Sequence, residues 1–310
     1  MTILPRPYQG QRDLVKMESI LTAGRKAANG AYYVHVGDLR WWMFYTDSDP
    51  RKGRICLPKA YSVGMGRQPD GLVTALTNLA DVRRVRLPGD ARPGAGSQDY
   101  DVGRRTPEAH SPIAGRRGNP QDVGERERRP AHPLAGNDGF TRTDEFMWAM
   151  LRSLDEPLPE TRLPQGYHVR RVDGEGEVCA RAAASHGAFG SSLAFEEYWP
   201  RMLRFMRSPV YRGDQDLVTV APDGRFASFC IVWPDPVTKV GLFEPVGTHP
   251  DFQRKGLGKA VVVEGLRRLK ARGMKQAIVC AEHDNPAARK LYESAGFRAI
   301  HKLHTFKKSI

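Results

Sequence analysis

The chain has 310 residues, four cysteines and a formal net charge of +13. Its length allows two domains with separate cores, and no stretch has the roughly 20 apolar residues that a membrane span needs. The first residues also lack the apolar core of a secretory signal, so we expect a cytoplasmic protein with no membrane partner. The cysteines have no paired spacing, which argues against a zinc site or a disulfide framework, and we predict no metal site.

The positive charge is spread over both halves of the chain. Such an excess is typical of a nucleic-acid partner or of phosphate-bearing small ligands. Neither an RNA-binding aromatic signature nor a helix-turn-helix pattern accompanies it, so we expect no nucleic-acid partner. A nucleic-acid-associated protein remains an alternative, which strongly salt-dependent retention on DNA would reveal.

The N-terminal half begins with a helical pattern at 11–28 and an aromatic cluster at 37–45, both typical of core segments. From about 83 to 133 the chain is rich in Arg, Gly and Pro and contains no Lys, Phe, Trp or Met. Such a tract buries too little apolar surface to offset its ordering entropy, and we predict that it is disordered. Either a natural insertion or a reading-frame slip between about 60 and 136 accounts for this composition.

Signs of ordered structure return at 139–154, and the Pro-rich segment that follows, 155–166, is predicted to be a linker. We therefore expect an N-terminal domain over 1–154 and a C-terminal domain over 167–310.

The C-terminal part alternates between strand and helix patterns. Strand patterns cover 167–172, 216–221, 225–233, 240–248, 275–281 and 298–306, and helical patterns cover 175–189, 195–206, 256–272 and 286–295. A hairpin followed by a strand-helix-strand unit predicts an α+β fold, with a mixed, mostly antiparallel sheet flanked by helices.

The stretch "QRKGLG" stands where a strand ends and a helix begins. A helix that starts near Gly256 exposes its first amides and a partial positive charge, and glycine lets a phosphate approach the backbone. Arg254, Lys255 and Lys259 add formal cations. A lone G-x-G is more often an ordinary turn with solvated charges, but the strand before it and the amphipathic helix after it favour a phosphate site.

Together, "VGTHPDFQRKGLG" and "NPAARKLYESAGF" resemble the acetyl-CoA-binding region of the GNAT superfamily of N-acetyltransferases, and the resemblance extends over about 165–310. It implies acetyl-CoA as co-substrate and no metal. The implied cofactor-binding residues are Val246, Gly247, Thr248, Gln253, Arg254, Lys255, Gly256, Leu257, Gly258, Lys259, Asn285 and Arg289. Backbone amides from Arg254 to Lys259 would bind the pyrophosphate, and the strand at 246–248 would pair with the pantetheine arm.

The same resemblance implies two catalytic residues. Tyr292 is the candidate acid that protonates the departing thiolate, and Glu244 is the candidate base that takes a proton from the amine. Each has a structural alternative, since Tyr292 fits a packed helix position and Glu244 fits a structural carboxylate. Pro245 cannot complete a sheet ladder, which predicts an edge or bulge at this point of the strand.

The N-terminal fragments "HVGDLRWWMFY" and "GFTRTDEFMWAMLRSLDEPLP" are similar to tandem acetyltransferases whose first repeat has degenerated. We predict an acetyl-CoA-dependent N-acetyltransferase that acts on a primary amine of a small molecule or peptide. A non-catalytic acyl-CoA-binding sensor and a mycothiol-synthase-like acetyltransferase remain alternatives, and neither the acceptor nor the oligomeric state is predicted.

Overall fold

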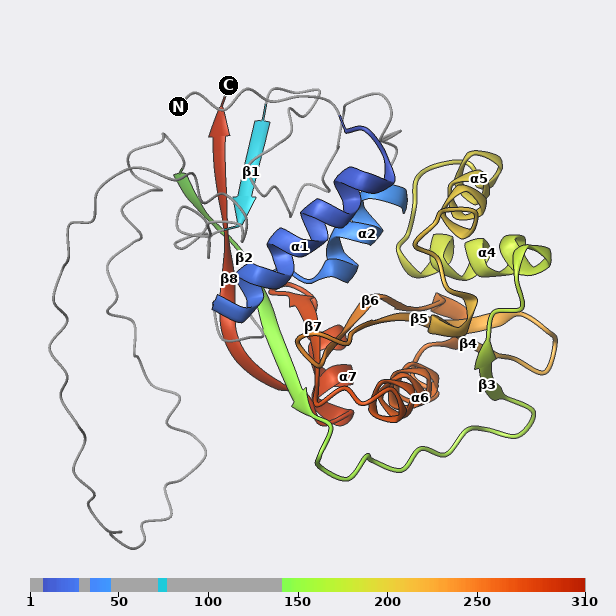
Figure 1. The fold of residues 1–310 in the computed structure, drawn as a ribbon. Helices are drawn as coiled ribbons and strands as arrows, with labels where there is room; N and C mark the ends of the chain where they lie inside the picture. The colour runs from blue at the N-terminus through green and yellow to red at the C-terminus, as the bar shows by residue number, and fades with distance from the viewer. Residues whose placement is uncertain (1–7, 28–33, 46–71, 77–140, 310) are drawn as a thin grey trace, which may run out of the picture.

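The computed structural model of the chain describes residues 8–27, 34–45, 72–76 and 141–309, and its strands form one eight-stranded sheet (Figure 1). The strands are β1 (Leu72–Leu76), β2 (Thr141–Ser153), β3 (His168–Arg171), β4 (Asp216–Val220), β5 (Phe226–Asp235), β6 (Val240–Thr248), β7 (Gln276–Glu282) and β8 (Arg298–Ser309). Their order is β1-β8-β2-β7-β6-β5-β4-β3, and only β6 and β7 pair in parallel. The mixed, mostly antiparallel sheet predicted from the sequence is confirmed.

Helices pack on both faces of the sheet. They are α1 (Gln11–Ala27), α2 (Val36–Tyr45), α4 (Val178–Ala188), α5 (Phe195–Met206), α6 (Leu257–Ala271) and α7 (Pro286–Ser294), with short 3-10 turns η3 (Glu175–Glu177), η4 (Gly213–Gln215) and η5 (Pro250–Phe252). One apolar cluster lies beneath α1, α2, α4 and α5, and a second lies beneath α6 and α7 (Figure 1). None of the helices in the described ranges has the length and apolar content of a membrane span.

Strand β5 contributes to both clusters because successive side chains of a strand point to opposite faces. Phe229 and Trp233 belong to the cluster beneath α2, α4 and α5, whereas Cys230 and Val232 belong to the cluster beneath α6. The central strands are therefore covered on both faces.

Strand β6 carries the irregularity that the proline predicted. Phe243 pairs with Val232 and Val246 pairs with Cys230, so two residues of β6 stand opposite one residue of β5. On its other side, β6 pairs with β7 only from Val240 to Leu242, opposite Gln276–Ile278. The two parallel strands therefore separate at the bulge, and none of the described strands pairs with the end of β6 on that side.

Strand β2 comes from before the predicted linker, yet it lies between β7 and β8. Its residues Met147–Ser153 pair with β7, and most of its length pairs with β8. The sequence did not predict this pairing. The two-domain division at 155–166 stays a prediction, but a fragment that starts after the linker would lack a central strand.

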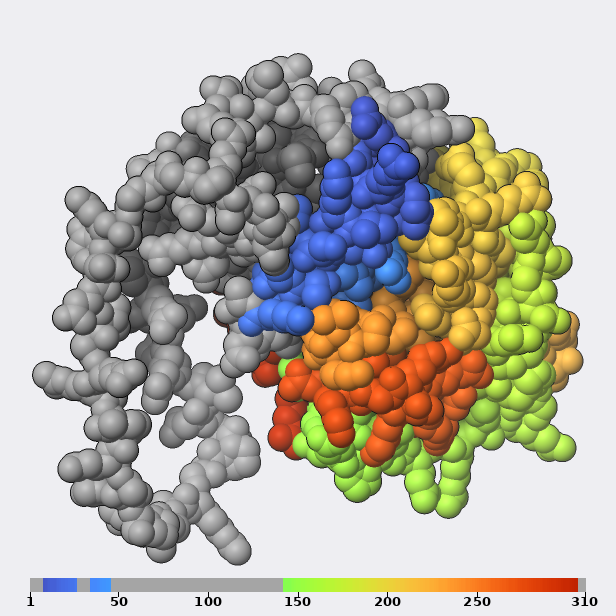
Figure 2. All heavy atoms as spheres, viewed as in Figure 1, coloured from blue at the N-terminus to red at the C-terminus, as the bar shows by residue number. Residues whose placement is uncertain are grey.

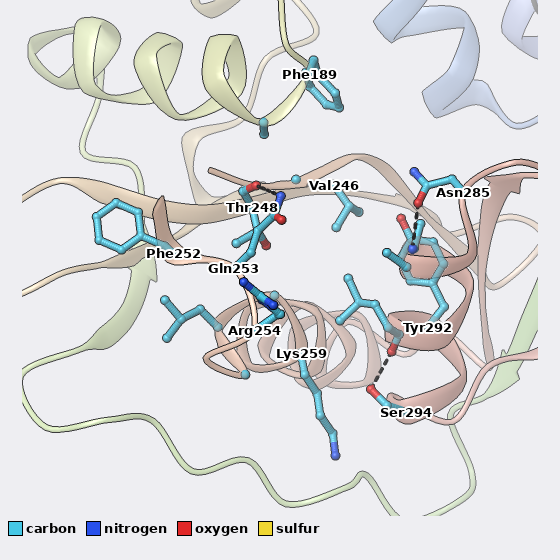
Figure 3. A pocket seen from close by; sticks show the side chains of 18 residues that line it. Phe189, Val246, Thr248, Phe252, Gln253, Arg254, Lys259, Asn285, Tyr292 and Ser294 are labelled. Atoms are coloured by element: carbon cyan, nitrogen blue, oxygen red, sulfur yellow. Dashed lines mark hydrogen bonds between the residues drawn. The ribbon is translucent and has the colours of Figure 1, made fainter. Parts of the chain in front are cut away.

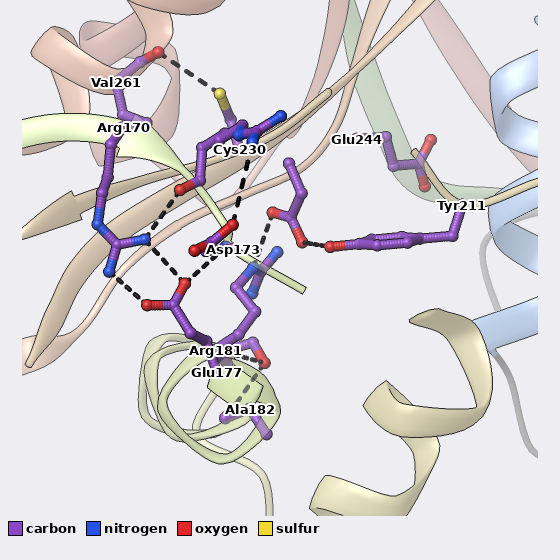
Figure 4. Close-up of polar contacts among 12 residues, drawn as sticks. Arg170, Asp173, Glu177, Arg181, Ala182, Tyr211, Cys230, Glu244 and Val261 are labelled. Atoms are coloured by element: carbon purple, nitrogen blue, oxygen red, sulfur yellow. Dashed lines mark hydrogen bonds and ion pairs between the residues drawn. The ribbon is translucent and has the colours of Figure 1, made fainter. Parts of the chain in front are cut away.

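A buried ion pair anchors α4 to β4. Nε of Arg181 donates to Oδ1 of Asp216 at 2.8 Å, with both side chains fully buried, and the Tyr211 hydroxyl donates to Oδ2 at 3.3 Å. Figure 4 shows Arg181 and Tyr211 together with Arg170 and Glu177, and the ion pair of Arg170 with Glu177 joins β3 to η3. The segment that carries α4 is thus fixed to the sheet by polar as well as apolar contacts.

Several predictions concern residues outside the described ranges. These are the disordered tract at about 83–133, the two explanations offered for 60–136, of which only β1 is described, and the state of Cys56. Of the other cysteines, Cys230 is buried, Cys280 is half-buried and Cys179 is exposed, and all three are free thiols.

Candidate active site

The loop between η5 and α6 has an unusual backbone. Arg254 (φ 61°) and Gly256 (φ 77°) both adopt the left-handed conformation, which glycine reaches easily and other residues rarely do. The amides of residues 254–259 donate no hydrogen bond within the described part of the chain. The next amide, that of Ala260, donates to the Gly256 carbonyl at 3.0 Å. The amides of residues 254–259 are therefore available to a ligand at the positive end of α6.

Two glycines of this loop serve different purposes. A Cβ added to Gly256 would meet nothing within 4 Å, so glycine is required there by its backbone angle, and the space above it is open. A Cβ added to Gly258 would lie 2.9 Å from Oγ1 of Thr248, so glycine is required there by close packing of α6 on the end of β6.

A cavity of about 470 Å³ lies beside this loop (Figure 3). Its lining residues are Ala188, Phe189, Val246, Gly247, Thr248, Phe252, Gln253, Arg254, Gly256, Leu257, Gly258, Lys259, Asn285, Ala287, Ala288, Leu291, Tyr292 and Ser294. The cavity thus joins the end of β6, the glycine loop, the start of α6, one face of α7 and the end of α4. Most of the residues implied by the family resemblance lie together here.

Two of the predicted cofactor-binding residues do not line this cavity. Nζ of Lys255 donates to the Asp251 carbonyl at 3.2 Å and lies over the ring of Phe252. Arg289 donates to Glu293 at 2.9 Å and lies over the ring of Trp148, at 4.6 Å from its centroid. Both cations have partners within the protein, so their role as cofactor-binding residues remains a prediction.

Two polar side chains of the motifs have structural roles that the sequence analysis did not consider. Oδ1 of Asn285 accepts a hydrogen bond from the amide of Ala288 at 3.0 Å and caps the start of α7 (Figure 3). Nε2 of Gln253 donates to the Thr248 carbonyl at 3.3 Å and ties the glycine loop to β6. Both residues also line the cavity, so these structural roles are compatible with contact to a ligand.

Sequence reasoning missed several residues of the cavity wall. Ala288 and Leu291 stood inside the quoted motif but were not assigned a role. Phe189, at the end of α4, is 52% exposed and lines the cavity, and an exposed phenylalanine of this kind is visible only in the structure.

Tyr292 is buried in the wall of this cavity, with 5% of its surface exposed. Desolvation raises the pKa of its phenol above the ordinary value, and the nearby Cys280, Cys230 and Glu244 raise it further. The phenol is therefore protonated at neutral pH, so it holds the proton that a general acid would give to the departing thiolate.

Glu244 is one of the two residues of the β6 bulge, and it does not line the cavity. It is half-buried, and its main-chain oxygen accepts a hydrogen bond from the Trp233 indole at 2.6 Å. Desolvation raises the pKa of its carboxyl well above the ordinary value, the charge of Asp38 and a hydrogen bond to it raise the pKa further, and the Trp42 indole lowers it. The candidate base thus contacts two residues of α2, which the sequence analysis had not connected with it.

Among the residues that the structure describes, no three His, Cys, Asp or Glu side chains are grouped as a metal site requires.

Residues 187–297 match the family model described as the Acetyltransferase (GNAT) family. The C-terminal half of the chain is therefore a GNAT acetyltransferase domain, as its two motifs predicted.

Individual relatives cover only part of the chain. Mycothiol acetyltransferase from Thermomonospora curvata is 29% identical over 170 residues, which are 54% of this chain and 56% of the relative. A solved GCN5-related N-acetyltransferase from Sphaerobacter thermophilus has a TM-score of 0.47 and 23% identity, covering 56% of this chain and 54% of that one. A tandem GNAT protein from the clavulanic acid biosynthesis pathway has a TM-score of 0.44 and 15% identity, with 56% of each chain covered. The chain thus spans little more than half the length of each.

Proposed function

We propose that the cavity beside α6 binds acetyl-CoA and that the protein transfers the acetyl group to a primary amine. The observation that carries this proposal is the run of available amides at 254–259, which lies in one cavity with Tyr292 and with the unpaired end of β6. Backbone amides at a helix start form a site for a phosphate group. The side chains of Arg254 and Lys259 line the same cavity and add positive charge.

The end of β6 supports the placement of an extended ligand. Residues Val246–Thr248 pair with β5 on one side, and on the side of β7 they have no strand partner among the residues that the structure describes. An extended chain with amide groups, such as pantetheine, can add to an open strand edge through main-chain hydrogen bonds. The cavity volume of about 470 Å³ lies within the usual range for small-molecule sites, about 300–1,000 Å³.

The chemistry follows from the two candidate catalytic residues. The amine nitrogen attacks the thioester carbonyl, a C–N bond forms and the C–S bond breaks. Glu244, directly or through water, takes the proton that the amine loses, and the Tyr292 phenol gives a proton to the departing thiolate. Holding both reactants together in a cleft supplies much of the remaining acceleration.

The acceptor is proposed only as a primary amine of a small molecule or peptide. The name of the matched relative supports one specific candidate within this class, acetylation that yields mycothiol. A non-catalytic acyl-CoA sensor would need the amides but neither Tyr292 nor Glu244, and the presence of both residues favours an enzyme.

Calorimetric titration of the full chain with acetyl-CoA tests the proposal. We expect a dissociation constant in the micromolar range or lower, and binding at least about 10-fold weaker in Gly256→Glu, because the new carboxylate would stand among the phosphate-binding amides. The matched control is Gly224→Glu in the turn between β4 and β5. Gly224 (φ 83°) also has open space around it, so this variant carries the same backbone strain outside the cavity and should bind normally. Equal affinities in both variants, or no binding by the folded wild-type protein, would overturn the cofactor assignment.

A further inference from the structure

Helix α2, from the N-terminal part of the chain, lies against the strands that carry the candidate base. It contacts β5 and β6 as well as α5. A Cβ added to Gly37 would be 2.5 Å from Cβ of Trp233, so the first turn of α2 packs on β5 with no room for a side chain. Figure 2 shows α1 at the molecular surface, with α2 largely covered behind it. The position of α2 over β6 is therefore tightly constrained.

The first turn of α2 presents Asp38 to Glu244. The two carboxyl groups share a side-chain hydrogen bond. Trp42, one helical turn further on, also lies near Glu244 and lowers the pKa of its carboxyl. The amide of His35 donates to Oδ2 of Asp38 at 2.7 Å and fixes this carboxylate at the helix start. Thus each carboxyl group is held in place by contacts of its own.

His35 is fully buried and does not compete for the proton. Its Nδ1 accepts a hydrogen bond from the amide of Gly37 at 2.9 Å, so the ring proton is on Nε2, which lies 3.1 Å from the Val240 carbonyl. Desolvation, with the charge of Arg25 adding to it, lowers the pKa of His35 to about 3, so this imidazole is neutral at physiological pH.

We propose that Asp38 and Glu244 form one paired-carboxyl unit, in which Asp38 is a positioning residue that sets the protonation of the candidate base. Two carboxylates in hydrogen-bond contact repel each other when both are ionised, so such a pair retains one proton over a wide pH range. The hydrogen bond between the two groups itself requires that proton, because carboxylates have no donor. The unit joins a residue of the N-terminal part of the chain to the acetyltransferase domain.

The surroundings decide which member of the pair carries the negative charge. Desolvation raises the pKa of Asp38 too, but this carboxylate accepts the His35 amide and lies near the positive charge of Arg25, both of which favour its ionised form. Desolvation favours the neutral form of Glu244, and no cation of the described residues offsets this by lowering its pKa. The other titratable or charged groups that face the pair and His35 are Arg40 on α2, Asp235 on β5, Cys280 on β7 and Tyr292 on α7. We therefore assign the charge to Asp38 and the proton to Glu244.

The unit has a consequence for the reaction, and this consequence rests on the proposed function. Glu244 can accept a proton from the acceptor amine only after it has lost the proton shared with Asp38. The pH at which the base becomes available is thus set by Asp38. The rate should rise with pH through a single acidic limb, and the apparent pKa of this limb should lie above the ordinary pKa of a glutamate, about 4.3.

The test uses the full chain and two readouts. In the infrared spectrum, the band of a protonated carboxyl group should persist at pH values where ordinary glutamates are ionised, and Glu244→Gln should remove it. Asp38→Asn keeps the shape of the side chain but removes its charge, so the same band should disappear at a pH lower by about one unit or more. Glu175→Gln is the matched control, since Glu175 lies on η3 and pairs with the exposed Arg207, and it should leave the band unchanged.

The activity readout is the pH dependence of kcat/KM, whose acidic limb should move in the same direction in Asp38→Asn. A wild-type spectrum identical to that of Glu244→Gln at every pH would overturn the proposal, and so would a folded Asp38→Asn protein that titrates like the wild type. If Asp38→Asn does not fold, the infrared comparison of the wild type with Glu244→Gln still shows whether Glu244 carries a proton at these pH values. The infrared experiment needs no acetyl transfer, so its outcome is independent of whether the proposed function holds.

Discussion

Gly258 at the start of α6 and Thr248 at the end of β6 leave no room for a side chain between them, since an added Cβ would lie 2.9 Å from the threonine hydroxyl oxygen. This contact brings the exposed amides of α6 next to the unpaired end of β6. The phosphate site and the strand edge proposed for pantetheine are therefore held together by one close approach of two residues.

The first prediction concerns this contact. Within a helix, Gly→Ala usually stabilises by about 1 kcal/mol, but overpacking usually costs about 1–3 kcal/mol. We expect Gly258→Ala to lower the free energy of unfolding and to weaken acetyl-CoA binding, as measured by urea titration and calorimetry. Thr248→Ala, added to Gly258→Ala, removes the clashing hydroxyl and should restore part of both losses. A Gly258→Ala protein more stable than the wild type would mean that helix propensity outweighs the contact.

Tyr292 supplies the second prediction. Tyr292→Phe keeps the ring and its packing against Phe297 but removes the phenolic proton. If this phenol protonates the thiolate, turnover should fall by roughly 10²-fold while acetyl-CoA affinity hardly changes. If Tyr292 is only a core residue, turnover should stay within a few-fold of the wild type and only stability should change, by about 1 kcal/mol. Steady-state rates and calorimetry on the same preparation separate the two cases.

The raised pKa of Glu244 also affects stability. A carboxyl group whose folded pKa lies above its unfolded value stabilises the fold at low pH, and this stabilisation is lost as pH rises through the folded pKa. Within the window from about pH 4.3 upward to that pKa, the wild type should lose about 1.4 kcal/mol per pH unit relative to Glu244→Gln. Urea unfolding of both proteins from pH 5 to pH 8 measures this difference. A difference that does not change with pH would place the Glu244 pKa in the ordinary range.

The buried pair of Arg181 and Asp216 gives a fourth prediction. Asp216→Asn keeps the shape of the side chain but leaves the guanidinium buried without its counter-charge, and a loss of about 3–5 kcal/mol is typical of such a change. Asp223→Asn is the control, because its pair with Arg225 is exposed and should contribute little. Chemical unfolding at neutral pH tests both variants, and equal stability of the two would contradict a structural role for the buried pair.

The parts of the site that the sequence predicted are local. The loop from Gln253 to Gly258 and the helix after Asn285 are encoded by short motifs, and their flanking strands and helices have clear periodic patterns. The bulge was predictable too, because Pro245 cannot donate a main-chain hydrogen bond to a neighbouring strand.

The parts that were missed depend on contacts between distant residues. Strand β2 is covered on both faces, with Leu151 packed against one cluster and Met150 in the other, so its sequence lacks the alternation that marks a half-exposed strand. The contact of Asp38 with Glu244 joins two segments about 200 residues apart, so no local sequence pattern predicts it. Packing of α2 on β6 had to be seen before the second carboxyl group could be connected with the site.

The most direct test of acetyl transfer is to incubate the full chain with acetyl-CoA carrying a ¹³C-labelled acetyl group and a panel of amines, peptides and aminoglycosides, including the precursor that lacks the acetyl group of mycothiol. CoA release and the mass of the products are followed together. We expect stoichiometric CoA release and labelled acetyl on the nitrogen of at least one acceptor, with the rate strongly reduced in Tyr292→Phe. A folded protein that binds acetyl-CoA but transfers its label to none of these amines faster than the uncatalysed reaction would contradict the enzyme and favour an acyl-CoA sensor.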